Sequence, residues 1–212
     1  MLQHPLRADF IMLVSDSHKF VFFHFPKTAG SSITHALAPY LTHNNRVPRD
    51  WHIPPEPTNA WMGWQPNHHI DLLQHSPVIK CNYPYTYFKA SFVRNPYDLV
   101  VSAWHNKEQP FTEFVIKEVA TRKNVVTRYG CQLDYLSDDK DNVLVDWIGR
   151  FENIALDWKK FCYFTKIPWR PLKKHNTSWK EPYQEYYTER TFRIVANLFE
   201  KDIKHFGYTL DK

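Results

Sequence analysis

One unit near the N-terminus limits what this chain can fold into, because an apolar run, a loop of small residues and a helical pattern follow one another directly. The run Phe20–Phe25 (FVFFHF) is typical of a buried strand, since it consists mostly of aromatic and β-branched residues. Pro26 follows it, and after Gly30 apolar residues recur at helical spacing until Pro39, which should stop or kink the helix near Ala38. A strand, a tight loop and a helix in this order present backbone N–H groups to an anion.

The rest of the chain continues to alternate between the two periodicities. Further strands are predicted at Phe10–Val14, Tyr87–Val93 and Val143–Ile148. Further helices are predicted from Pro96 with Asn95 as N-cap, at Phe111–Lys123, at Asn153–Phe164, and as one C-terminal helix through Phe192 and Phe206 that Gly207 ends. This order predicts an α/β fold around a mainly parallel sheet. The length of 212 residues fits one domain, 1–212, interrupted by a variable loop region at His43–Pro66.

The charge balance favours an anionic ligand without pointing to nucleic acid. Lys and Arg number 27 against 22 Asp and Glu, but they form no clustered basic stripe. The cysteines Cys81, Cys131 and Cys162 are widely separated, which argues against a disulfide framework or a zinc site. No run is apolar enough for a signal peptide or a membrane span, so we expect a cytoplasmic protein without stable membrane insertion.

The first candidate binding motif is the loop between the first unit's strand and helix. Small residues allow the backbone to wrap around a phosphate or sulfate, and the helix N-terminus favours negative charge. Lys27 adds a mobile cation, but the lysine precedes the glycine, so the loop is not a Walker A motif. The alternative is a polar turn with an exposed lysine. The loop residues are Pro26, Lys27, Thr28, Ala29, Gly30, Ser31 and Ser32.

The second candidate binding motif is Phe92–Asp98 (FVRNPYD), followed by Ser102. Arg94 should lie at the carboxyl end of a strand, which is where open α/β sheets bind ligands. Ser102 lies two turns into the following helix, so both side chains could reach one phosphate. The alternative for Arg94 is an ordinary surface ion pair.

Four ordered motifs together resemble one known family, the sulfotransferases that use 3′-phosphoadenosine-5′-phosphosulfate (PAPS). Besides the two motifs above, the resemblance rests on WIGRFENIALDW at 147–158 and on the run HNTSWKEPYQEYYTERTFRIVANLFEKDIKHFGY at 175–208. The branch that the chain resembles is that of the Golgi-type carbohydrate sulfotransferases and their soluble bacterial relatives. The resemblance extends over about 20–208 and is interrupted at His43–Pro66.

The resemblance implies a fold, a cosubstrate and roles for the motif residues. The implied fold is a P-loop-kinase-like three-layer sandwich with a mainly parallel central sheet. The first loop would hold the 5′-phosphosulfate, with Lys27 on the oxygen that bridges phosphate and sulfonyl. Arg94 and Ser102 would bind the 3′-phosphate, and no metal would be required. Segments at Arg150–Asn153 and at 176–180, including Asn176 and Ser178, would close over the nucleotide.

The resemblance also implies a general base, since the acceptor hydroxyl must lose its proton. Members of this branch often place a histidine between the loop and the second motif, which makes His69 the first candidate, with His68 and His75 as alternatives and Glu56 as an outside one. The acidic run at 138–141 lacks the spacing of a calcium loop and is expected to be a solvated turn.

The acceptor is expected to be a saccharide hydroxyl, and 3′,5′-ADP (PAP) the second product. Trp51, Trp61 and Trp64 in the variable loop could stack on sugar rings or could attach the loop to the body of the protein. A polysaccharide, a glycolipid, a small glycoside and a peptide tyrosine all stay open. Two other classes also stay open: a nucleotide-dependent phosphoryl transferase, and a nucleotide-binding relative without catalysis.

Overall fold

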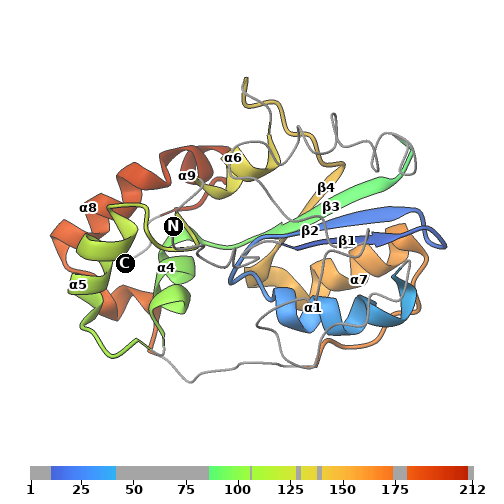
Figure 1. The fold of residues 1–212 in the computed structure, drawn as a ribbon, viewed down its shortest axis with the longest axis horizontal. Helices are drawn as coiled ribbons and strands as arrows, with labels where there is room; N and C mark the ends of the chain where they lie inside the picture. Colours follow the sequence, from blue (N-terminus) through green and yellow to red (C-terminus); the bar gives the residue numbers. More distant parts are fainter. Residues whose placement is uncertain are drawn as a thin grey trace, which may run out of the picture.

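A mixed sheet forms the centre of the fold. The computed structural model describes residues 11–41, 86–105, 107–127, 130–137, 140–173 and 181–209. In these residues the sheet has four strands in the order β1-β2-β3-β4 (Figure 1). The strands are β1 (Ile11–Ser15), β2 (Phe20–His24), β3 (Phe88–Val93) and β4 (Trp147–Arg150). β1 is antiparallel to β2, whereas β2, β3 and β4 run parallel, so their carboxyl ends meet at one edge.

The first three strands confirm the predicted ones to within a residue or two, but the fourth begins later than predicted. Val143 forms only an isolated bridge with Ser137, and the ladder with β3 starts at Trp147. At Asp146 the backbone N–H donates to the Lys89 carbonyl at 2.8 Å, but the Lys89 N–H donates to the Asp146 carboxylate at 2.7 Å and not to a backbone carbonyl. The strand prediction for Val143–Ile148 was therefore wrong for its first four residues, and the strand continues to Arg150.

The predicted helix starts are mostly confirmed. The helix after the first loop gives way to a 3₁₀ turn that contains Pro39, as the proline required. Asn95 caps its helix by accepting the Tyr97 N–H at 3.0 Å. Among the described residues before 170, the helices are α1 (Gly30–Leu37), η1 (Ala38–Tyr40), α4 (Pro96–Trp104), α5 (Phe111–Phe114), the π-helical η2 (Val115–Val119), α6 (Gln132–Leu136), η3 (Phe151–Asn153) and α7 (Ile154–Thr165).

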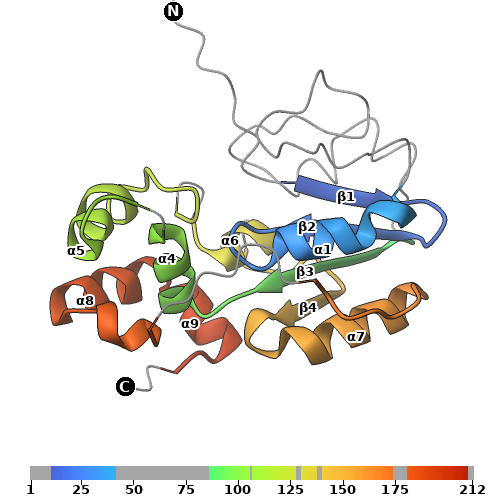
Figure 2. The same cartoon turned by 90° about the horizontal axis from the view of Figure 1, so that it is seen from below.

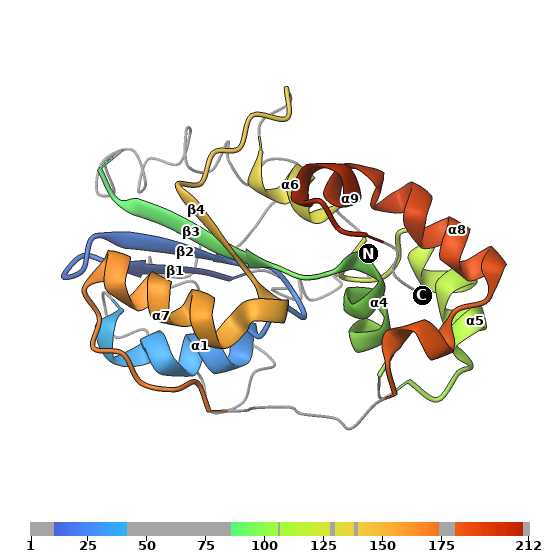
Figure 3. The same cartoon turned by 180° about the vertical axis from the view of Figure 1, so that it is seen from behind.

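The C-terminal helical run is divided, contrary to the prediction of one helix. After the short η4 (Tyr183–Tyr186), α8 (Glu189–Leu198) ends at Phe199, whose φ of −112° and ψ of 23° leave the helical region, and α9 (Glu200–Phe206) follows. The break places Phe199 fully inside the core and brings α9 beside α6 (Figure 3). Gly207 ends the run in the left-handed region, with φ 63°.

The two faces of the sheet meet different parts of the core. Phe20 and Phe22 point to the cluster that contains α1 and α7, which lie side by side on one face (Figure 2). Val21 and Phe23 belong to the other cluster, which joins α4, α5 and α8 beyond the carboxyl ends of the parallel strands. The α/β class with a mostly parallel sheet is confirmed, while the three-layer sandwich stays a prediction. The carboxyl edge therefore faces the helical group, and the sequence motifs meet there.

Candidate functional site

The loop that follows β2 has a fixed and unusual backbone. Lys27 and Ala29 both adopt left-handed conformations, with φ 66° and 65°, which cost on the order of 1 kcal/mol each for residues other than glycine. Between them Thr28 is buried and donates its hydroxyl to the Phe25 carbonyl at 2.7 Å. The loop is therefore held in a shape that its own residues do not prefer.

This shape leaves the start of α1 suited to an anion. The N-cap is Ala29, which has no side chain to accept from the first N–H groups, and the first turn contains no acidic residue. Lys27 is exposed and Ser31 is half-buried, whereas Pro26, Gly30 and Ser32 are buried. A bound phosphate or sulfate would supply the acceptor that the N-cap lacks.

Gly30 has a further reason to be glycine that the sequence motif did not indicate. A Cβ at this position would lie 1.5 Å from His24 Nε2, so the imidazole occupies the space beside the helix start. His24 itself is buried at the end of β2. Its only signal in the sequence was a histidine within an apolar strand, which sequence reasoning passed over.

The buried imidazole makes stability depend on pH. Burial lowers the pKa of His24 from 6.5 to about 4. As the pH decreases, the His24 imidazole is protonated in the unfolded chain before it is protonated in the folded protein. The free energy of unfolding should therefore fall between pH 6.5 and pH 4, by on the order of 3 kcal/mol in all. Urea denaturation at a series of pH values measures this. His24→Gln should flatten the acid slope, and an unchanged slope in that variant would contradict the assignment to His24.

Arg94 connects the second motif to the first. It follows β3 directly, and its residue is only 5% exposed, so the ion pair that it forms with Asp98 is buried and does not lie at the surface. One terminal nitrogen, Nη1, donates to the Lys27 carbonyl at 2.8 Å, while Nε and Nη2 contact the Asp98 carboxylate at 2.7 Å. The Phe151 ring covers one face, with its centroid 3.8 Å from Cζ. The guanidinium therefore fixes the backbone of Lys27.

Arg94 retains donors for a further partner. A guanidinium carries five N–H groups, and the contacts above use three of them. Ser102 is half-buried and lies two turns farther along α4. The two side chains share one helical region, but their joint binding of a phosphate stays a prediction.

The third motif lies against the second at the carboxyl edge. Val93 and Arg150 are paired in the ladder between β3 and β4. In the next residues Glu152 accepts the Asn95 N–H, and Phe151 covers Arg94 as described. Three motifs that are far apart in the sequence therefore meet around Arg94.

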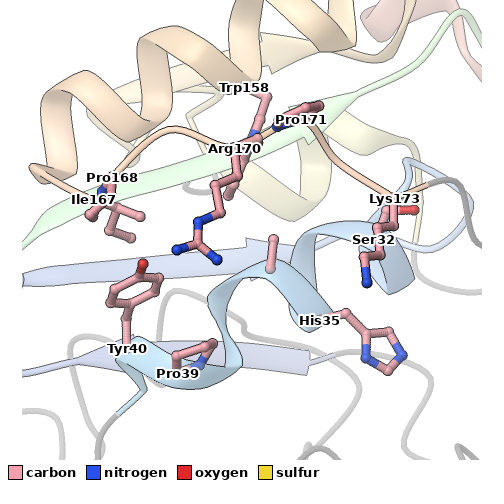
Figure 4. Close-up of a pocket in the computed structure, with 11 residues that line it drawn as sticks. Ser32, His35, Pro39, Tyr40, Trp158, Ile167, Pro168, Arg170, Pro171 and Lys173 are labelled. Atoms are coloured by element: carbon pink, nitrogen blue, oxygen red, sulfur yellow. The ribbon is translucent and has the colours of Figure 1, made fainter.

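A pocket of about 350 Å³ adjoins the loop and lies between α1 and the segment that follows α7 (Figure 4). Ser32, the last residue of the loop, and His35 line one end, and Tyr40 lines the other. The opposite wall comes from the segment after α7, which contributes Arg170 and Lys173. The volume lies at the lower end of the range of small-ligand sites, and the walls combine apolar surface with the cations Arg170 and Lys173.

Several sequence-predicted site residues lie outside the described residues. These are the base candidates His69, His68, His75 and Glu56, the tryptophans Trp51, Trp61 and Trp64, and the closing residues Asn176 and Ser178. Their roles stay predictions.

Within the described ranges, no group of three or more His, Cys, Asp or Glu side chains could hold a metal ion. Cys131 is buried, as expected, and burial raises the pKa of its thiol. The described helices include none that is both long and apolar enough to cross a membrane.

The comparisons with known proteins support the family that the sequence motifs resemble. The chain matches the model of the sulfotransferase family over residues 11–209. The chain therefore belongs to the sulfotransferase family, and it is a transferase of sulfonyl groups. No curated protein and no solved structure matches it.

Proposed function

We propose that this sulfotransferase takes its sulfonyl group from PAPS, transfers it to a saccharide hydroxyl and releases PAP. The observation that carries the proposal is the bond of 2.8 Å from Arg94 Nη1 to the Lys27 carbonyl, which joins two anion-binding motifs into one site. PAPS carries two anionic groups, a 5′-phosphosulfate and a 3′-phosphate, and so suits a site that combines the Lys27 cation with the N–H donors of Arg94.

The loop before α1 is proposed to bind the 5′-phosphosulfate. Its supports are the uncapped helix start and the exposed cation of Lys27. The 3′-phosphate is assigned to the remaining donors of Arg94, with Ser102 adding a hydroxyl. Because the Phe151 ring and the Asp98 carboxylate fix the guanidinium, little side-chain freedom remains to be lost on binding.

The pocket beside Ser32 is proposed to hold the adenosine. It begins at the last residue of the phosphate loop, and a volume of about 350 Å³ suits a nucleoside. Lys173 lines the pocket immediately before the segment that contains Asn176 and Ser178, which we propose closes over the nucleotide.

The chemistry follows from placing these groups around the donor. PAPS supplies an activated sulfonyl group, and the acceptor oxygen forms a new S–O bond as the bond from sulfur to the bridging oxygen breaks. Lys27 stabilises the negative charge that develops on the bridging oxygen. The acceptor proton passes to a base, for which His69 is the proposed residue and His68 the alternative.

The distinguishing test is a calorimetric titration of PAP and ADP against wild type, Arg94→Ala and Arg170→Ala. We expect wild type to prefer PAP by at least ~10²-fold, because the 3′-phosphate forms charge-assisted hydrogen bonds. Arg94→Ala should lose this preference. Arg170→Ala is the matched control: it should weaken PAP and ADP to the same extent and keep the preference, because its pocket is assigned to adenosine.

The outcomes separate the candidate functions. Equal binding of PAP and ADP by wild type would contradict the PAPS proposal. It would favour a different sulfonyl donor, or a relative that binds nucleotides without catalysis. If PAP is preferred, labelled PAPS with polysaccharides, glycolipids, small glycosides and tyrosine peptides identifies the acceptor. Transfer to the peptides alone would contradict the saccharide assignment.

A further inference from the structure

The backbone of Arg94 is held by a side chain and not by a neighbouring strand. The ladder between β3 and β4 ends at the pair Val93 and Arg150, so Arg94 lies one residue beyond it. Its N–H donates to Gln132 Oε1 at 2.8 Å, and its carbonyl accepts from Gln132 Nε2 at 2.8 Å. The amide of Gln132 therefore occupies the place that a peptide group of another strand would take.

A buried carboxylate fixes the orientation of that amide. Asp202, on α9, accepts from Gln132 Nε2 and from the Gln132 backbone N–H, both at 2.9 Å, and its other oxygen accepts the Leu133 N–H at 2.7 Å. If the amide were turned over, Oε1 would face this carboxylate, and two acceptors would repel each other. Asp202 thus selects the one orientation in which Gln132 can bind both backbone groups of Arg94.

Burying the polar side chains of Gln132 and Asp202 costs free energy, so we expect the pair to have a function beyond stabilising the core. Gln132 and Asp202 are both 0% exposed. Burial raises the pKa of the Asp202 carboxyl, while the N–H donors of Gln132 and Leu133 act in the opposite direction. Apolar residues of similar size often stabilise a core as well as a buried charge does. Apolar residues could not bind the N–H and the carbonyl of Arg94, and so could not fix the orientation of its backbone.

We propose that Gln132 and Asp202 are positioning residues for donor recognition. They set the backbone of Arg94 and, through it, the place of the guanidinium that contacts the Lys27 carbonyl. The inference rests on the proposed function, since the quantity that they control is the preference for a 3′-phosphate. It also extends the donor site to α6 and α9, for which the sequence predicted no contact with the donor.

The test substitutes the two residues and measures the affinity for PAP and for ADP. Gln132→Met keeps the length of the side chain and removes both bonds to Arg94. Asp202→Asn keeps the size but leaves one acceptor oxygen for three N–H donors. We expect each variant to lower the ratio of PAP to ADP affinity at least ~10-fold, with ADP affinity changed less than ~3-fold, because ADP has no 3′-phosphate.

A matched control removes a buried amide elsewhere. Asn124 is 6% exposed and binds the Val126 N–H at 3.2 Å and the Glu118 carboxylate at 3.1 Å, but it has no described contact with Arg94. Asn124→Leu should lower the thermal unfolding temperature and leave the affinity ratio of the folded protein unchanged. A role that is only structural would make all three variants behave in this way.

The results separate this inference from the proposed function. An unchanged ratio in Gln132→Met and Asp202→Asn, with the ratio lost in Arg94→Ala, overturns the positioning role alone. No preference for PAP in wild type overturns the proposed function itself. If Gln132→Met does not fold, as judged by circular dichroism, the milder Asp202→Asn decides the question through the same ratio.

Discussion

Lys27→Ala should lower kcat for sulfonyl transfer by about 10²–10³-fold while changing the affinity for PAP only a few-fold. This is the effect expected when a donor that stabilises developing charge is removed. The side chain is exposed at the loop, so shortening it leaves no cavity in the core. Initial rates with labelled PAPS and the identified acceptor measure kcat, and a PAP titration measures binding.

The substitution Lys27→Ala removes the cation and keeps the contact between the two motifs. Arg94 binds the backbone carbonyl of Lys27, so that contact remains when the side chain is shortened. Lys204→Ala is the control for net charge, because Lys204 forms an exposed pair with Glu200 far along the chain on α9. Its kinetics should equal those of wild type. A loss of PAP affinity as large as the loss in kcat would show that Lys27 serves ground-state binding and not the transition state.

The local parts of this site could be predicted from the sequence because their signals are local. The strand before Pro26, the loop and the helix stop at Pro39 depend on residues that are neighbours in the chain. The same is true of the Asn95 cap. Such features follow from periodicity and capping chemistry alone.

The long-range contacts of the site could not be predicted in the same way. The bond between Arg94 and the Lys27 carbonyl joins residues 67 positions apart, and the bond between Gln132 and Asp202 joins residues 70 apart. These contacts depend on strand order and on the division of the C-terminal helix at Phe199, which one continuous apolar stripe concealed. The backbone before β4 likewise takes part in a long-range contact, the bond from the Lys89 N–H to the Asp146 carboxylate, which joins residues 57 apart.

Gly30→Ala should destabilise the loop strongly, although the position is helical. Alanine is favoured over glycine within a helix by about 1 kcal/mol, and Gly30 is the first residue of α1. The expected loss therefore comes only from the contact of 1.5 Å between the new Cβ and His24 Nε2. Overpacking of this kind costs roughly 1–3 kcal/mol, and we expect PAP affinity to fall more than ~10-fold because the loop must move.

A double-mutant cycle with His24→Ala tests that cause directly. Without the imidazole the Cβ that Gly30→Ala introduces has room, so this substitution should cost nothing in the His24→Ala background and should restore part of the helix propensity. Urea denaturation of the four proteins gives the coupling free energy, which we expect to be about 2 kcal/mol. An equal cost of Gly30→Ala in both backgrounds would mean that the backbone, and not the imidazole, requires glycine. The requirement for glycine at position 30 would then come from the backbone conformation of the loop, and the His24 imidazole would not contribute to it.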